Sequence, residues 1–252
     1  MLGDWTALPV GIVIATLASM VGLGGGILWT PYLIFVAGFE LSEAVLMSLT
    51  IQIAGMASGG LASIMRGKTN VRFAIFLALL AFPGVSLGVW LSRVIDPESL
   101  VFLLGIACLA TAMVFVFARE EYAFQPSEEV TIKELIPYAW TPPLFSILTG
   151  LLSVGVGDFL VPILRNRLNM KMDAAIGACL IVMAINAACA SALRMAWGQA
   201  FPGRFIFWAI LGVLIGGQIG PRLADKVPDQ TLKEIFIYGL SLVGIHILFN
   251  AW

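Results

Sequence analysis

Residues 6–38 read TALPVGIVIATLASMVGLGGGILWTPYLIFVAG, a stretch without Lys, Arg, Asp, Glu or His. As one straight helix it would be about 50 Å long, which exceeds the ~30 Å hydrocarbon core of a bilayer. The helix must therefore break, and the sequence marks the break with Gly22, Gly24, Gly25 and Gly26. Because a bilayer tolerates non-helical backbone only where protein or water covers it, the break predicts a binding site at membrane depth.

The composition is that of a membrane protein. Of 252 residues, 60% are hydrophobic and 12% charged, whereas a soluble domain carries about 25% charged residues. The net charge of −1 and the lack of a basic stripe argue against a nucleic-acid partner. Cys108, Cys179 and Cys189 lie in apolar runs without CxxC spacing, so we expect packing roles, with handling of a sulfur substrate as the alternative. We expect no metal or other cofactor.

Polar breaks divide the chain into two similar halves. The linker 119–134 (REEYAFQPSEEVTIKE) separates a first membrane repeat, 1–118, from a second, 135–252. Each half begins with a glycine-broken stretch, 5–39 or 135–164, and continues with three apolar blocks of about the length that a spanning helix needs. The blocks are 42–64, 73–91 and 100–118 in the first half, and 174–192, 205–219 and 235–252 in the second.

The two halves also share a motif. A shift of 132 residues aligns Gly84 with Gly216 and Gly88 with Gly220, so that both halves read GxxxGxxL. Small residues four apart let helices pack closely in lipid, so each GxxxG predicts a helix contact. The agreement between the halves indicates an internal duplication.

The distribution of Lys and Arg predicts the orientation of the halves. If each broken stretch crosses the membrane once, the 14 basic residues divide seven and seven between the faces. If each stretch enters and leaves by the same face, only Arg93, Arg194 and Arg204 oppose the other 11, which are Arg66, Lys68, Arg72, Arg119, Lys133, Arg165, Arg167, Lys171, Arg222, Lys226 and Lys233. The second division is a positive-inside pattern. We therefore expect re-entrant broken stretches, three crossings per half, inverted repeats, and both termini outside the cytoplasm.

Three strings resemble a known family: SMVGLGGGILWTPYL at 19–33, RGKTNVRFAIFLALLAFPGVSLGVWLS at 66–92 and IGGQIGPRLADKVPDQTLKEIFIYGLSLVGI at 215–245. They are similar to the paired signature segments of the TauE/SafE sulfite exporter family, and the resemblance covers nearly the whole chain. It implies transport of small sulfur-containing anions such as sulfite, thiosulfate or sulfoacetate. Members of this family are usually drawn with seven or eight spans, which differs from the six crossings that the charge pattern predicts.

The first signature is complete in this chain, with Gly22, Gly24, Gly25, Gly26 and Pro31. The second half departs from it. There, SVGVGDFLVP at 153–162 supplies Gly155 and Gly157 and then Asp158, a carboxylate where the family pattern implies glycine.

A helix that starts just after a glycine loop presents unpaired N–H groups and a positive dipole end, which suits an anion. We expect Ile27 and Phe159 to begin two half-helices that meet near the midplane, with a sulfite or sulfonate between them. Gly24, Gly25 and Gly26 would permit close approach of the backbone or a positive φ. Polar side chains on flanking spans either complete the site or serve interhelical hydrogen bonding: Ser48, Thr50, Gln52, Asn186, Ser191 and Gln218. Since no Lys or Arg lies within a predicted span, backbone dipoles, protons or ions would neutralise the anion.

Asp158 has two interpretations. It is a proton-coupling group that is neutral when substrate binds, or it caps its half-helix by accepting from the N–H groups of Leu160 or Val161. The lone histidine, His246, is a candidate proton relay or an interface packing residue.

The sequence thus predicts an all-α polytopic secondary transporter of the bacterial cytoplasmic (inner) membrane, working by alternating access as a monomer or homodimer. Its substrate would be a small sulfur oxyanion or organosulfonate, with protons as the candidate coupling ion. The alternative is an intramembrane enzyme or redox component that uses the cysteines or His246. Against this alternative, the sequence shows neither a nucleophile and base pair nor an HExxH motif.

Overall fold

The computed structural model describes residues 3–21, 24–67, 69–117, 132–224 and 229–250, and all regular structure within them is helical. Gly22, Lys68, Arg119 and Lys226, which enter the predictions above, lie outside the described residues. The long helices of the described part have 21 to 25 residues each: α3 (Leu41–Met65), α4 (Val71–Leu91), α5 (Pro97–Phe117), α9 (Met172–Ala196), α10 (Gly203–Ala224) and α11 (Asp229–Asn250). They follow the six predicted apolar blocks.

Membrane-spanning length is reached by several of these helices. Among the described residues, five helices (α3, α4, α5, α9 and α10) are long and apolar enough to cross a bilayer. In α11 the apolar run is shorter and covers Ile237–Phe249. The predicted all-α polytopic membrane architecture is confirmed.

The two glycine-rich stretches form pairs of short helices. The first pair is α1 (Ala7–Val21) and α2 (Gly26–Pro31), and α2 continues as the π-helical turn η2 (Tyr32–Val36). The second pair is α7 (Thr141–Leu152) and α8 (Val156–Leu168). The longest of the four, α1, has 15 residues and is only about 22 Å long, so none of them can span a ~30 Å hydrocarbon core alone. Short helical turns precede both pairs: η1 (Asp4–Thr6), α6 (Ile132–Leu135) and η3 (Ile136–Tyr138).

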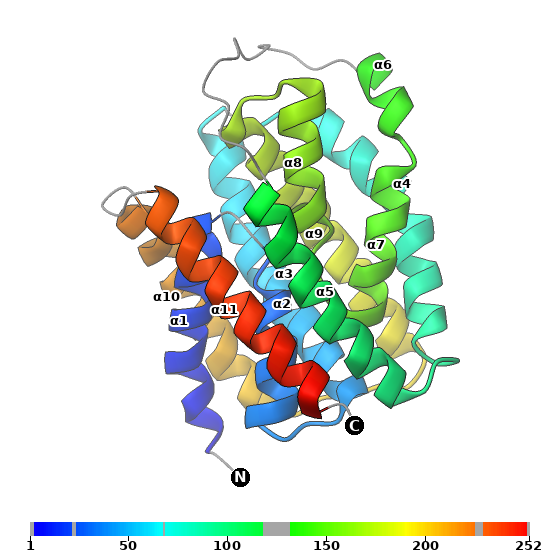
Figure 1. Ribbon diagram of the computed structural model, residues 1–252, viewed down its shortest axis with the longest axis vertical. Coiled ribbons are helices and arrows are strands. Elements are labelled where there is room, and N and C mark those ends of the chain that lie inside the picture. The colour runs from blue at the N-terminus through cyan, green and yellow to red at the C-terminus, as the bar shows by residue number, and fades with distance from the viewer. Residues whose placement is uncertain (1–2, 22–23, 68, 118–131, 225–228, 251–252) are drawn as a thin grey trace.

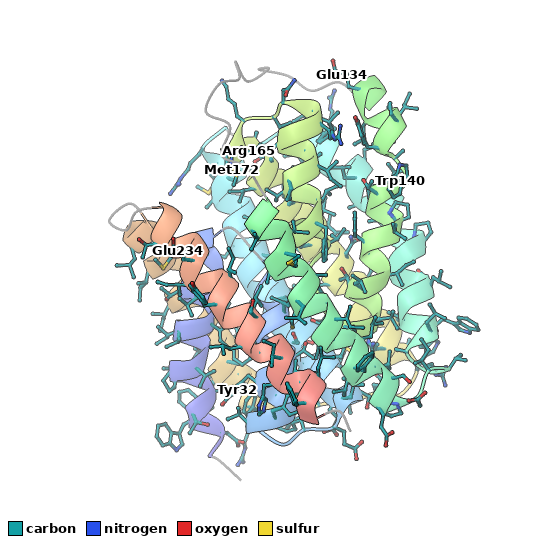
Figure 2. All side chains as sticks on the ribbon, in the orientation of Figure 1. Tyr32, Glu134, Trp140, Arg165, Met172 and Glu234 are labelled. Atoms are coloured by element: carbon teal, nitrogen blue, oxygen red, sulfur yellow. The ribbon has the colours of Figure 1, made fainter. Side chains whose placement is uncertain are left out.

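The two short pairs lie at opposite ends of the molecule. In Figure 1, α1 begins at the lower end, and Tyr32, which follows α2, is labelled at that same end in Figure 2. The second pair starts below α6 at the upper end and returns there, where Figure 2 labels Arg165 on α8. Each pair therefore enters and leaves by one end, and α11 finishes at the lower end, where α1 starts (Figure 1).

Helix contacts follow the order expected of a duplicated chain. In the alignment of the halves, α1 corresponds to α7 and α4 to α10. The structure packs α1 along α10 and α7 along α4, while α3 packs on α9 and α5 on α11. If each helix is replaced by its counterpart in the other half, the α1–α10 contact becomes the α7–α4 contact, and the α3–α9 and α5–α11 contacts stay the same. A two-fold pseudo-symmetric arrangement has this property.

The GxxxG motifs make the first two of these contacts. A Cβ on Gly84 of α4 would overlap the Pro143 carbonyl oxygen of α7, and a Cβ on Gly216 of α10 would overlap the Ile12 carbonyl oxygen of α1. The predicted packing role of these motifs is confirmed. Because only a glycine leaves room for the facing backbone, the motifs bring helices together in lipid without a hydrophobic driving force.

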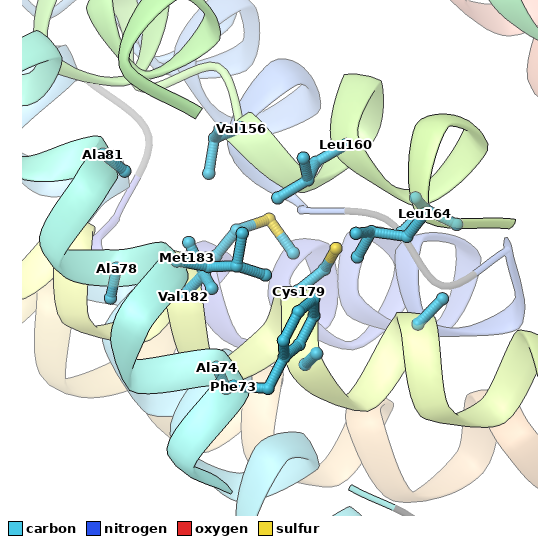
Figure 3. Packing of buried hydrophobic residues seen from close by; sticks show 14 of the residues in the cluster. Phe73, Ala74, Ala78, Ala81, Val156, Leu160, Leu164, Cys179, Val182 and Met183 are labelled. Carbon is cyan, nitrogen blue, oxygen red and sulfur yellow. The ribbon is translucent and has the colours of Figure 1, made fainter. Parts of the chain in front are cut away.

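A buried core holds α8 in place (Figure 3). It packs side chains of α8, such as Leu160 and Leu164, together with Phe73 of α4 and the Cys179 and Met183 side chains of α9. This core fixes the start of α8, and with it Asp158, relative to the long helices.

Candidate substrate site between two helix breaks

The two helix breaks lie against each other in the protein interior. A Cβ built on Gly24 of the first break would lie 3.4 Å from the Gly155 Cα of the second. A Cβ on Gly26 would overlap the Ser153 carbonyl oxygen and the side-chain amide of Gln52. The glycines therefore serve as the contact between the halves.

The first break does not need its glycines for a positive φ, which was one of the two reasons that the sequence suggested. None of Gly24, Gly25 and Gly26 is among the residues with positive φ, so that prediction is wrong for them. A Cβ on Gly25 would meet its neighbours at 3.5 to 3.7 Å, an ordinary van der Waals distance. Close approach is the constraint, and it is strictest at Gly26.

Both half-helices begin earlier than predicted. The first, α2, starts at Gly26 rather than Ile27, with Gly25 as its N-cap. The second, α8, starts at Val156, three residues before Phe159, with Gly155 as its N-cap. Asp158 therefore lies within the first turn of α8, where the positive end of the helix dipole favours a carboxylate.

Asp158 connects the two halves. Its side chain is fully buried, and its Oδ1 accepts a 3.0 Å hydrogen bond from the Gly24 N–H of the other break. The structure shows no cap on Leu160 or Val161, so that form of the capping interpretation is wrong: the earlier start of α8 directs the carboxylate across the break. Its Oδ2 has no hydrogen-bond partner.

A small polar network lies beside Gly26. Gln52 donates from Nε2 to the Ser153 carbonyl oxygen at 3.0 Å and also to the Ser153 hydroxyl. The Ser153 hydroxyl lies 2.9 Å from the Ser48 hydroxyl and donates to it. All three side chains are buried. Ser153 ends α7 in the left-handed conformation with φ 63°, which turns its carbonyl group toward α3.

The carbonyl groups of the second break accept hydrogen bonds from side chains one after another. Arg194 donates to the Gly150 and Leu151 oxygens at 2.7 and 3.2 Å. Thr30 donates to Leu152 at 3.2 Å, Gln52 to Ser153, and Thr149 to Val154 at 2.7 Å. These donors satisfy the negative end of α7. Asp158 lies at the other end of the second break, in the first turn of α8, where the helix dipole is positive.

Sulfur-containing side chains cover the opposite side of the breaks. The Met183 thioether reaches Gly24, Gly155 and Gly157 closely enough to meet a Cβ on each at 2.7 to 3.1 Å. Figure 3 shows Met183 and Cys179 of α9 facing α8. The Met56 methyl group approaches Gly24 from α3. The surroundings of the breaks are therefore polar toward Gln52 and soft and apolar toward Met183.

The remaining predicted site residues lie in different places. Thr50 donates to the Leu46 carbonyl of its own helix at 2.8 Å. Asn186 is fully buried, and neither its amide nitrogen nor its amide oxygen has a partner. Ile27 is buried in the core. Gln218 is exposed on α10, outside the buried network. The exposed His246 packs edge-on against Phe35, with ring centroids 5.7 Å apart.

Arg194 corrects the expectation that no Lys or Arg lies within a span. The predicted block ended at 192, but α9 continues to Ala196 and buries Arg194 to 1% exposure. The carbonyl oxygens of α7 accept hydrogen bonds from the guanidinium and so offset part of the cost of burying it. An arginine two residues beyond an apolar block is a weak signal, and nothing in the sequence pointed to its partners.

Sequence reasoning also missed Ser153, because its role depends on the helix ending at that residue. Among the described residues, no group of three or more His, Cys, Asp or Glu side chains could hold a metal ion.

Two discontinuous helix pairs whose breaks meet inside a bundle of spanning helices define the architecture of a membrane transporter. The chain belongs to the sulfite exporter TauE/SafE family, whose model matches residues 7–247. This match confirms the resemblance noted in the sequence.

Curated relatives are named as transporters. The chain is 22% identical to a probable membrane transporter protein of Xylella fastidiosa over 93% of its own length and 90% of the relative. It is 27% identical to one from Haemophilus influenzae, covering 95% and 96%. It is 20% identical to the probable membrane transporter protein YunE of Bacillus subtilis, covering 96% of each. No solved structure matches the chain.

Proposed function

We propose that this protein is a secondary transporter that carries a small sulfur oxyanion or organosulfonate across the bacterial cytoplasmic membrane by alternating access. The family assignment supports a sulfur anion as the substrate class. In this proposal the anion binds at the N-terminal ends of α2 and α8, near Gly24, Gly26 and Gly157. Gln52 of α3 lies beside Gly26, and we assign Asn186 of α9 to the same site.

One observation carries the proposal. The side-chain Oδ1 of Asp158 accepts from the Gly24 N–H at the break of the other half. The break therefore holds a carboxyl oxygen at a backbone N–H group, which is the contact that a sulfite or sulfonate oxygen would make. In this proposal, Asp158 takes the hydrogen bond from Gly24 that the substrate would otherwise take.

Proton coupling follows from this competition. Two negative groups at one site repel each other, and a desolvated carboxylate is costly inside a membrane. Protonation removes the charge of Asp158, which lets the substrate anion take the Gly24 N–H in its place. The proton and the anion would then move in the same direction, and release of both would restore the hydrogen bond between Asp158 and Gly24.

We also propose that the halves 1–118 and 135–252 are inverted repeats, joined by the linker 119–134, with α1–α2 and α7–α8 as re-entrant hairpins. The exchange of helix contacts between the halves and the opposite ends at which the two pairs begin support this arrangement (Figure 1). The end that carries Arg165 would face the cytoplasm, and both termini would face outward.

The test is flux of ³⁵S-labelled sulfite into proteoliposomes that contain the purified protein. We expect uptake that rises with an inward proton gradient and is absent from protein-free liposomes. Thiosulfate and sulfoacetate, each supplied in labelled form in parallel assays, define the substrate range. Absence of flux for all three anions would contradict the proposal.

A further inference from the structure

Unpartnered polar atoms gather along one helix. In the part of the chain that the structure describes, five buried side-chain nitrogen or oxygen atoms have no hydrogen-bond partner. One is the Asp158 Oδ2; the other four belong to α9, namely both amide atoms of Asn186, the Ser191 hydroxyl and the Arg194 Nε. Because buried polar groups are nearly always satisfied, such a concentration calls for a ligand or water.

The unpartnered α9 residues are spread along one side of the helix. With about 100° and 1.5 Å per residue, Asn186, Ser191 and Arg194 fall within an arc of about 140° and extend over about 12 Å of helix. Asn186 lies three residues beyond Met183, which touches the breaks. Arg194 lies near the opposite end of α9 from Met172, which Figure 2 labels at the upper end. This row of side chains therefore extends from the breaks toward the lower end of the molecule.

The charge of Arg194 has no anionic partner among the described residues. Its acceptors are all neutral: the Gly150 and Leu151 carbonyl oxygens and the Gln199 Oε1 at 3.2 Å. A buried cation is costly unless an opposite charge compensates it. An anion bound beside Arg194 would supply the opposite charge.

Capping of α7 does not by itself require this charge. The next three carbonyl groups of the same break accept from the neutral side chains of Thr30, Gln52 and Thr149. A neutral donor can therefore satisfy a carbonyl group at this helix end. The guanidinium adds a positive charge and an unused Nε–H, and the Ser191 hydroxyl, three residues away on the same helix, is also unused.

We propose that Arg194 and Ser191 form a second oxyanion-binding site, which receives the substrate on the lower side of the breaks and passes it along Asn186 toward Gly24. This inference rests on the proposed function. The guanidinium binds the anion by charge and by Nε–H, and the hydroxyl donates to a second oxygen. Under the proposed topology this site faces outward.

The test compares the KM for ³⁵S-sulfite in right-side-out and inside-out membrane vesicles. Because hydrogen bonds to charged groups are among the strongest in proteins, Arg194→Gln should raise the outward-side KM about 10-fold or more and leave the other KM within about 2-fold. Arg194→Lys keeps the charge and should restore much of the loss. Arg93→Gln is the matched control, because Arg93 lies over the Trp197 ring at 4.9 Å on the neighbouring surface, and it should behave as wild type.

Ser191→Ala and Asn186→Leu separate binding from folding. Both remove atoms without protein partners, so neither should lower the melting temperature of the purified protein. Ser191→Ala should still raise the outward-side KM, and Asn186→Leu should slow transport. Wild-type KM values for Arg194→Gln and Ser191→Ala, in vesicles where the unmodified protein transports sulfite, would overturn the second site and leave the proposed function standing. A KM effect confined to inside-out vesicles would keep the site and reverse the topology. No flux of sulfite, thiosulfate or sulfoacetate by the unmodified protein would overturn both proposals.

Discussion

The Gly24 N–H of the first helix break donates to the Asp158 carboxylate of the second at 3.0 Å, across 134 residues of sequence. The contact joins the N-terminal region of one half-helix to the first turn of the other. A backbone amide that holds a carboxylate in the protein interior is also able to hold a substrate anion, so this hydrogen bond relates the fold to the proposed transport cycle.

Asp158→Asn should abolish sulfite accumulation driven by a pH gradient while sulfite exchange at equal pH persists. The asparagine oxygen still accepts from Gly24, but the side chain no longer takes up or releases a proton. Uptake and counterflow in proteoliposomes measure the two activities separately. Unchanged pH-driven accumulation would exclude Asp158 as the coupling group.

Asp96→Asn is the matched control for that experiment. Hydrogen bonds from the Ser99 backbone N–H and then the Ser99 hydroxyl hold the pKa of Asp96 below its ordinary value. An aspartate with a lowered pKa stays ionised between about pH 5 and pH 8, so it binds no proton in the range of the assay. The pH dependence of transport by Asp96→Asn should therefore match that of the unmodified protein.

Gly26→Ala should disrupt the site, whereas Gly25→Ala should be tolerated. The new methyl group at 26 would overlap the Ser153 carbonyl and the Gln52 amide, while at 25 it would meet ordinary contacts of 3.5 Å or more. Overpacking of this kind costs about 1–3 kcal/mol. Thermal stability in detergent and sulfite flux should fall for Gly26→Ala alone. Equal loss in both variants would show that close approach at Gly26 is not the constraint.

Ser153→Gly should be more stable than Ser153→Ala by about 1 kcal/mol, because glycine adopts the left-handed conformation without the cost that an L-residue bears. Both variants lose the hydroxyl that bonds Ser48 and Gln52, so the comparison isolates the backbone conformation at φ 63°. Melting temperatures of the two purified proteins test it. The reverse order would mean that a side chain at this position contributes more than the backbone strain.

Gln199 and Lys171 should label from opposite sides of the membrane. Gln199 follows α9 and Lys171 precedes it, so one spanning helix separates them. In a background without the native cysteines, we expect a cysteine at Gln199 to react with an impermeant maleimide from outside, and a cysteine at Lys171 to react only after the membrane is opened. Outside labelling of both would contradict α9 as a crossing.

The class of the protein could be predicted from its sequence because that information is local or repeated. An uncharged stretch too long for the bilayer must break at its glycines, whatever surrounds it. The six apolar blocks coincide with helices because twenty apolar residues in lipid have few alternatives to a helix. The glycine pairs at 84, 88, 216 and 220 likewise predicted helix contacts that the structure contains.

Only the tertiary structure decided which side chains meet at the breaks. Helix ends depend on contacts with the rest of the chain, so the start of α8 at Val156 and the extension of α9 past Arg194 were not readable from hydropathy. The partners of Asp158 and Arg194 lie in distant segments, and no local pattern records them. Gln218 was expected in the site because it is polar and lies within a GxxxG motif, yet its side chain is exposed. Sequence periodicity places a residue on a helix, but the packing of several helices determines where that residue points.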